Sequence, residues 1–178
     1  MKIYTRHGDY SETSVIGGKK IAKDDAYIDA IGCIDELNSV IGIIISFSDD
    51  NELKEHLIKI QRTLFVIGSD LAAPVEEKTG TIRLSANKVS EIETLIDNIN
   101  NELPKIETFI LPGGNKLASL LHFARAVCRK SERSVVTLSK RNKINEIILS
   151  YLNRLSALLF VLARRINQKK KVQEMFWR

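Results

Sequence analysis

Apolar side chains recur every three or four residues in five stretches of this chain, a spacing that places them on one face of an α-helix. The first stretch, 24–47, carries Ile31, Ile34, Leu37, Ile41, Ile44 and Ile45. The other four cover 51–72, 85–101, 115–139 and 143–168. Stripes of this width, joined by short connections, predict an all-α five-helix bundle. Ser85 is expected to cap the third helix.

The composition favours a single domain over residues 1–178. Only 3 prolines and 9 glycines interrupt the chain, too few for the turns of a β-sandwich or barrel. We expect 1–23 to form an N-terminal loop, 24–168 the bundle, and 169–178 a solvated tail. No apolar run approaches the length of a membrane span, and the first residues lack the apolar stretch of a secretory signal. We therefore expect a cytoplasmic protein that does not cross a membrane.

The charge balance favours an anionic partner, because 27 Lys and Arg face 22 Asp and Glu, a net charge of +5. Charge alone does not choose between a nucleotide, a nucleic acid and a membrane surface. Aromatic residues make up only 6% of the chain and do not alternate with basic ones, which argues against a nucleic-acid module. The 3 histidines and 2 cysteines show no metal-ligand spacing, so no protein-held metal is predicted.

Two segments have the residue types of a triphosphate site. Residues 5–25 combine hydroxyls, glycines and cations, although they form no Walker A loop, and an ordinary basic arm is the alternative. In the fourth helix, Arg125, Arg129 and Glu132 share one sector beside the apolar face, with His122 near its edge. That sector indicates either a ligand site or an intrahelical ion-pair ladder.

Ordered motifs give a more specific indication. They are Thr5-Arg6-x-Gly8-Asp9 with Thr13, Lys23-Asp24-Asp25, Gly32-x-x-Asp35-Glu36-Leu37-Asn38-Ser39, Phe109-x-Leu111-Pro112-Gly113-Gly114, Leu121-His122-x-Ala124-Arg125-x-x-x-Arg129 and Asn153-Arg154-Leu155-Ser156. In this order they make the chain resemble the PduO-type ATP:cob(I)alamin adenosyltransferases. The resemblance implies a homotrimer with active sites between subunits. It also implies transfer of the 5′-deoxyadenosyl group of ATP to the cobalt of cob(I)alamin or a related corrinoid, giving adenosylcobalamin and triphosphate. The alternative is a non-catalytic bundle that binds ATP or corrinoid as a carrier or sensor.

The resemblance also implies residue roles. Asp35 and Arg125 are expected to pair across the subunit interface, Arg129 to act on the triphosphate, and Phe109 to exclude the lower axial ligand of the corrin. Nucleotide contacts are expected at Thr5, Arg6, His7, Gly8, Thr13, Ser14, Lys23, Arg129, Lys130, Ser131, Glu132, Arg133 and Asn153. ATP is the expected cosubstrate, with Mg²⁺, and cobalamin the substrate. A Co(II) reductase and a B12-dependent acceptor enzyme are the further partners it suggests.

Four positions depart from the family pattern. Ser11 replaces a glycine, Lys130 an arginine, Ser131 an alanine and Ala157 an aspartate. If residue 11 has a positive φ, serine costs about 1 kcal/mol relative to glycine. Lys130 keeps the charge but loses bidentate phosphate geometry. We expect these changes to affect ATP affinity more than the type of reaction.

Overall fold

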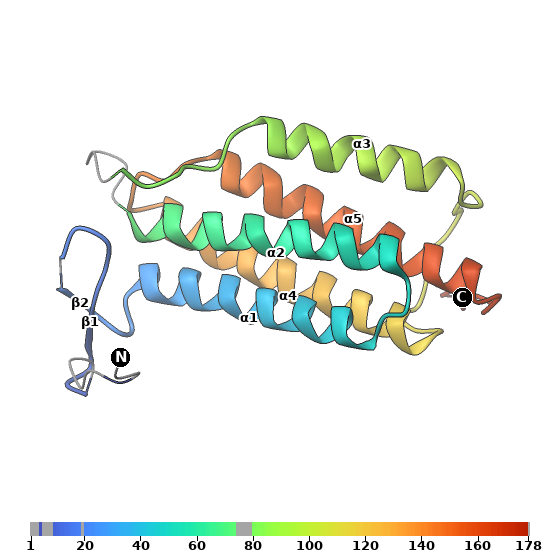
Figure 1. Cartoon of the computed structure of the whole chain (residues 1–178), viewed down its shortest axis with the longest axis horizontal. Helices are drawn as coiled ribbons and strands as arrows, with labels where there is room; N and C mark the ends of the chain where they lie inside the picture. The colour runs from blue at the N-terminus through green and yellow to red at the C-terminus, as the bar shows by residue number, and fades with distance from the viewer. Residues whose placement is uncertain (1–3, 5–8, 19, 74–79, 178) are drawn as a thin grey trace.

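Five long helices lie side by side in the computed structural model, which describes residues 4, 9–18, 20–73 and 80–177 (Figure 1). The predicted five-helix bundle is therefore confirmed. The elements are β1 (Glu12–Ser14), β2 (Lys20–Ala22), α1 (Ala26–Phe47), α2 (Asn51–Ala72), α3 (Asn87–Asn101), α4 (Lys116–Ser139) and α5 (Ile147–Lys169). The largest boundary difference is at α5, which begins four residues after the predicted start at 143.

Side-chain caps mark the starts of α1, α2 and α4. The Asp25 carboxylate accepts a hydrogen bond from the Tyr27 N–H at 2.9 Å and so caps α1. The predicted cap at Ser85 is wrong. Helix α3 begins after Ala86 without a side-chain capping bond, because the Ser85 hydroxyl bonds to the Asn87 side chain instead.

The N-terminal segment contains a small β-hairpin that the hydrophobic pattern did not predict. Strands β1 and β2 pair antiparallel, and Gly17 and Gly18 between them have φ values of 99° and 81°. Ser11, just before β1, has a φ of 61°, so the strain considered for this departure from the family pattern is present. The Ser11 carbonyl accepts a hydrogen bond from the Lys23 N–H at 2.9 Å, which closes the hairpin.

The helices pack in the spatial order α2, α1, α4, α5, α3. One continuous apolar core runs through them, and its fully buried side chains include Leu37, Ile41, Leu57, Leu64, Leu121, Leu152 and Leu155. Each such side chain contributes about 1.5–3 kcal/mol through burial. Helices α1 and α5 are long and apolar enough to cross a membrane by length and composition. In α5, 61% of the most apolar window is buried in the bundle, and core helices meet the same criterion, so this is weak evidence for a span.

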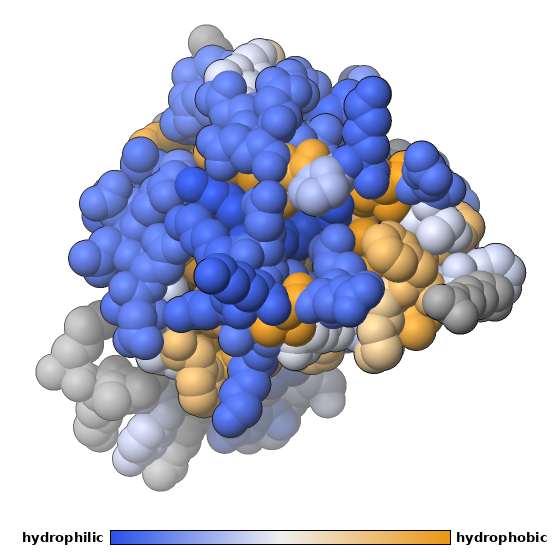
Figure 2. All heavy atoms as spheres, turned by 90° about the vertical axis from the view of Figure 1, so that its right-hand side faces the viewer, coloured by the Kyte–Doolittle hydropathy of each residue, from blue (hydrophilic) through white to orange (hydrophobic). Residues whose placement is uncertain are grey.

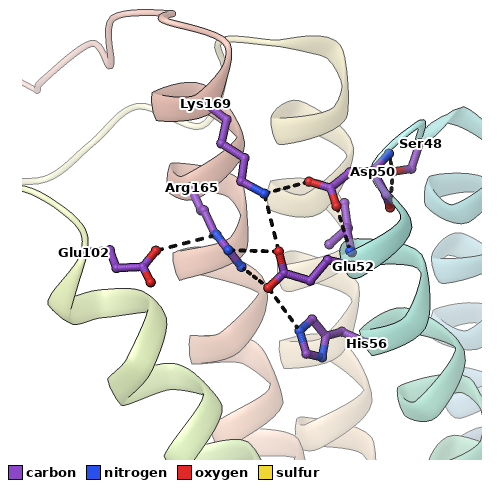
Figure 3. A network of polar contacts seen from close by, with 8 residues as sticks. Ser48, Asp50, Glu52, His56, Glu102, Arg165 and Lys169 are labelled. Carbon is purple, nitrogen blue, oxygen red and sulfur yellow. Dashed lines mark hydrogen bonds and ion pairs between the residues drawn. The ribbon is translucent and has the colours of Figure 1, made fainter.

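A network of ion pairs fastens one end of the bundle (Figure 3). The Arg165 guanidinium donates to both carboxylate oxygens of Glu52, at 2.9 and 3.0 Å, and Lys169 Nζ donates to Asp50 at 2.9 Å. These bonds tie the last turns of α5 to the first turn of α2. The hydrogen bond from Lys169 lowers the pKa of Asp50, and the one from Arg165 lowers the pKa of Glu52. This end carries a mostly hydrophilic surface with hydrophobic atoms gathered at one side (Figure 2).

Candidate functional site

A cation-bearing sector runs along α4, as the helical period predicts. Arg129 is exposed, whereas Arg125 and Glu132 are half-buried. Within the described residues neither arginine forms an ion pair with Glu132, so the intrahelical ladder is not formed. Glu132 instead accepts a hydrogen bond from the Asn153 side-chain amide at 3.2 Å, and Arg133 donates to the Arg129 carbonyl at 3.1 Å. The guanidinium groups of Arg125 and Arg129 are thus available to partners other than Glu132.

Three buried nitrogen atoms beside this sector lack a hydrogen-bond partner among the described residues. They are Arg125 Nε and both ring nitrogens of His122. The His122 ring packs against Phe160 with centroids 5.9 Å apart, and only 3% of His122 is exposed. Burial, and then the charge of Arg125, lower the pKa of His122, so the ring is neutral near pH 7. An unsatisfied buried polar group costs about 1–3 kcal/mol, so a surface or ligand that supplied partners to this part of α4 would be stabilising.

Asp35 lies exposed on α1 and has no ion pair within the described part of the chain. It does not pair with Arg125 of the same chain, as required if the two residues meet between subunits. The exposed carboxylate of Asp35 on α1 and the partly buried guanidinium of Arg125 on α4 are complementary in charge. Their pairing across an interface is a proposal taken up below.

Two residues for which nucleotide contacts are expected have polar partners within the chain. Lys130 Nζ lies 2.6 Å from a carboxylate oxygen of Glu36, on the side of α4 that faces α1. Ser131 is fully buried, with its hydroxyl 2.8 Å from the Cys33 carbonyl and 3.0 Å from the Val127 carbonyl. The structure therefore gives the Ser131 hydroxyl a role in holding α4 against α1. Its hydroxyl has no surface on which a nucleotide could bind.

The N-terminal residues are only partly described. Thr5, Arg6, His7 and Gly8, which the motif assigned to ATP, lie outside the described residues. Thr13 and Ser14 belong to β1, and Lys23 is exposed two residues before Asp25, the cap of α1. The hairpin stands beyond the start of α1 (Figure 1) and is anchored by the Ile16 N–H, which donates to the Ala72 carbonyl at 3.1 Å. Within the described residues no hydrogen bond or ion pair joins it to the α4 arginines.

Phe109 presents its ring to solvent, with 79% of the residue exposed. The alternative role, in which the ring anchors its loop in the core, is therefore excluded. The loop is held by its backbone: the Trp177 N–H donates to the Phe109 carbonyl, and the Leu111 N–H to the Met175 carbonyl, both at 2.8 Å. Phe109, Leu111 and Trp177 line a shallow, open depression of about 340 Å³ on the surface.

The C-terminal tail was the part of this site that sequence reasoning missed, because it was expected to be solvated. Its Glu174 carboxylate lies 3.2 Å from Arg164 Nε, and Arg164 Nη2 donates to the Pro104 carbonyl at 2.9 Å. Arg164 is 3% exposed. The available signal was the aromatic pair Phe176 and Trp177, which follows a lysine run and would be unusual in a fully solvated tail.

The turn before α4 depends on Gly114, which has a φ of 101°. A Cβ at this position would collide with the Asn167 side chain. That side chain accepts a hydrogen bond from the Asn115 N–H at 2.9 Å and donates to the Gly113 carbonyl at 3.1 Å. The close approach of α5 to this turn fixes the exit of the Phe109 loop.

These features define a class of protein: a helical bundle that offers cations and hairpin hydroxyls to a phosphate-bearing ligand and exposed aromatic side chains to an apolar one. Such an arrangement can hold two substrates and neutralise a phosphate leaving group. Within the described residues no group of three His, Cys, Asp or Glu side chains could hold a metal ion.

The family model described as cobalamin adenosyltransferase matches residues 3–166, and the chain belongs to this family. It is 42% identical to a corrinoid adenosyltransferase of Bacillus subtilis, over 98% of this chain and 91% of that protein. It is 40% identical to the human corrinoid adenosyltransferase MMAB, over 99% of this chain and 73% of that protein.

Solved structures show the same fold. A phenylalanine-to-alanine variant of a PduO-type ATP:corrinoid adenosyltransferase from Lactobacillus reuteri, complexed with cobalamin and ATP, has a TM-score of 0.96. It is 37% identical and covers 99% of both chains. An arginine-to-lysine variant complexed with ATP has a TM-score of 0.93 at 37% identity, over 99% of this chain and 100% of the other. The resemblance inferred from the ordered motifs is confirmed.

Proposed function

We propose that the chain transfers the 5′-deoxyadenosyl group of ATP to the cobalt of cob(I)alamin or a related corrinoid. The observation that carries the proposal is the family match over residues 3–166, together with 37% identity to structures that hold ATP and cobalamin. The activity makes the chain an enzyme of the ATP:corrinoid adenosyltransferase type. A non-catalytic carrier or sensor remains the alternative, motivated by the four departures from the motifs.

In the proposed reaction, Co(I) attacks the 5′ carbon of ATP as a nucleophile. The new bond is Co–C5′, and the C5′–O bond breaks with its electron pair leaving on triphosphate. Cobalt is thereby oxidised from Co(I) to Co(III). The chain must hold the carbon in line with cobalt and stabilise the charge that develops on the departing triphosphate.

We assign the triphosphate contacts to the hairpin and to α4. Lys23 and Arg129 are exposed cations on these two elements. The further proposed contacts are Thr5, Arg6, His7, Gly8, Thr13, Ser14, Glu132, Arg133 and Asn153. Mg²⁺ usually binds through one or two carboxylates plus substrate phosphates, so it would enter with ATP. When bound, Mg²⁺ neutralises phosphate charge.

Assembly is the second part of the proposal. Among the residues that the structure describes, buried nitrogens of Arg125 and His122 have no hydrogen-bond partner, and the exposed carboxylate of Asp35 has no ion pair. A homotrimer in which Asp35 meets Arg125 of a neighbour would satisfy part of this set. Sedimentation equilibrium at micromolar concentration tests it, and a monomer of this chain's mass would refute it. Asp35→Asn should lower activity and weaken assembly.

Phe109 is proposed to lie under the corrin and exclude the lower axial ligand. Its exposed ring and the neighbouring apolar side chains Leu111 and Trp177 support this role, because a corrin bound over them would meet carbon atoms in place of a coordinating base. Phe109→Ala should leave the melting temperature within a few degrees. It should also change the spectrum of bound Co(II)alamin in the presence of ATP. An unchanged spectrum would assign ligand exclusion to another group.

An anaerobic assay of cob(I)alamin consumption with ATP tests the reaction itself. Binding of both substrates without turnover would favour the carrier.

Lys23→Ala should raise the KM for ATP. Arg129→Ala should lower kcat as well as ATP affinity, because a residue that follows the leaving group acts in the transition state. We further propose a cytoplasmic location, a Co(II) reductase as electron source and a B12-dependent enzyme as acceptor.

A further inference from the structure

The spatial order of the helices leaves the bundle open on one side. Helix α2 packs mainly on α1, and α3 packs mainly on α5, so α2 and α3 form the two ends of the series. A groove with a volume of about 780 Å³ runs between them. None of the residues assigned above to ATP, cobalamin or assembly lines it.

The groove has an apolar floor. Ile60 of α2, Leu95 of α3 and Leu158 of α5 line it, together with the ring of Tyr151. Burial raises the pKa of Tyr151, so its phenol stays neutral at every physiological pH. This floor suits a hydrocarbon surface.

The rim carries an excess of positive charge. Four cations line the groove against a single carboxylate, Glu91, which pairs with Lys88 at 2.7 Å. Arg83 pairs with a carboxylate behind the groove at 2.8 Å. Lys59 and Arg62, three residues apart on α2, are exposed and form no ion pair within the described residues. The charge left over is therefore positive and lies along one edge.

The size of the groove suits a small, elongated ligand. On α2 it extends from His56 to Val66, about 15 Å of helix. The groove falls within the range of about 300–1,000 Å³ that is typical of small-molecule sites.

We propose that the groove between α2 and α3 is a second ligand site, for a free long-chain carboxylate of the fatty-acid class. The chain lies on the floor formed by Ile60, Leu95 and Leu158. The carboxylate lies at the edge formed by Lys59 and Arg62. The site is independent of the proposed adenosyl transfer.

Calorimetric titration of the full-length protein with laurate, below its micelle concentration, tests the site. We expect saturable binding with a micromolar Kd. Dodecyltrimethylammonium has the same chain length with a cationic head and should bind at least about tenfold more weakly, because the rim would repel it. The double variant Lys59→Glu/Arg62→Glu should weaken laurate binding about tenfold or more.

Two further variants make the test specific. Lys140→Glu/Arg141→Glu reverses two exposed cations beyond the groove and should leave the laurate Kd unchanged. Thr94→Trp adds a bulky ring to an exposed lining position and should abolish binding while the melting temperature is kept. All three variants should retain adenosyl transfer, since none alters the proposed active site.

Several results would overturn the proposal. One is the absence of saturable laurate binding, and another is equal binding of the cationic amphiphile. A third is a Kd that the Lys59→Glu/Arg62→Glu variant leaves unchanged. The protein binding only to phosphatidylglycerol vesicles, and not to free laurate, would identify the rim as a membrane-facing surface and would equally refute a fatty-acid site.

Discussion

Replacing Glu174 with glutamine tests whether a buried ion pair fastens the C-terminal tail to the bundle. The side chain of Arg164 is 3% exposed and that of Glu174 16% exposed, and they meet at 3.2 Å. Glutamine keeps the size of the side chain but leaves the Arg164 charge without its counter-ion. Removing one partner of a buried pair costs about 3–5 kcal/mol.

The lower end of that range applies here, because Arg164 retains its hydrogen bond to the Pro104 carbonyl at 2.9 Å. A loss of about 3 kcal/mol in the free energy of unfolding corresponds to a fall in Tm of about 6–12 °C for a chain of this size. Thermal unfolding followed by circular dichroism measures it. Glu55→Gln is the matched control, since Glu55 is exposed and forms no hydrogen bond or ion pair with another side chain in the described part of the chain.

The tail itself has a reporter. Trp177 is the only tryptophan of the chain, so its fluorescence reports on this segment alone. In Glu174→Gln the fluorescence anisotropy should fall, because the tail is held less firmly beside Phe109. The double variant Arg164→Met/Glu174→Leu removes both charges and should recover most of the lost stability. A Tm for Glu174→Gln within about 2 °C of the Glu55→Gln control, with unchanged anisotropy, would refute this account of the tail.

Three other predictions concern the turn before α4, the hairpin and the end of the bundle. Gly114→Ala should destabilise by about 2–4 kcal/mol in chemical denaturation, from positive-φ strain and displacement of the α5 amide, whereas Gly113→Ala, where a Cβ meets nothing within 4 Å, should cost less than about 1 kcal/mol. Ser11→Gly should relieve up to about 1 kcal/mol of strain, measured as slower hydrogen exchange of the amide that donates to its carbonyl; unchanged exchange would contradict the strain. The pKa values of Asp50 and Glu52 are lowered in the folded state. Their contribution to the free energy of unfolding is therefore present above their unfolded pKa values near 4, and it is lost as the pH falls through their folded pKa values. Tm should therefore fall more steeply below about pH 4 than in Asp50→Asn/Glu52→Gln, and parallel curves would exclude this linkage.

The spacing of apolar residues predicted the helices, because each helix buries one continuous stripe of side chains that lie three or four residues apart in sequence. The cap of α3 was predicted less well. Ser85 has the right residue type, but whether its hydroxyl reaches a backbone N–H depends on a local conformation that residue type alone does not determine. The β-hairpin was missed because three-residue strands leave no periodic signal.

Within the site, the helical period was more informative than motif position for two residues. Lys130 and Ser131 follow Arg129 by one and two residues, which turns them about 100° and 200° around α4. Those rotations place Ser131 in the apolar face and Lys130 towards Glu36, as observed. The pairing of the tail with the Phe109 loop could not be predicted, because it joins segments more than 60 residues apart in sequence.

Two arginines of this chain show why the α4 sector points outward. Arg164 is almost completely buried, yet its own chain supplies a carboxylate and a carbonyl for it. Arg125 is only half-buried, but its Nε and both nitrogens of neighbouring His122 have no partner among the described residues. The fold thus supplies hydrogen-bond partners to the more buried Arg164, whereas the Nε of the less buried Arg125 has none among the described residues. Because an unsatisfied buried polar group costs about 1–3 kcal/mol, the α4 sector gains more from a second surface that supplies acceptors than the Arg164 region does. Asp35 is exposed and forms no ion pair within the described residues, so in the proposed trimer its carboxylate would supply the charge that this sector requires.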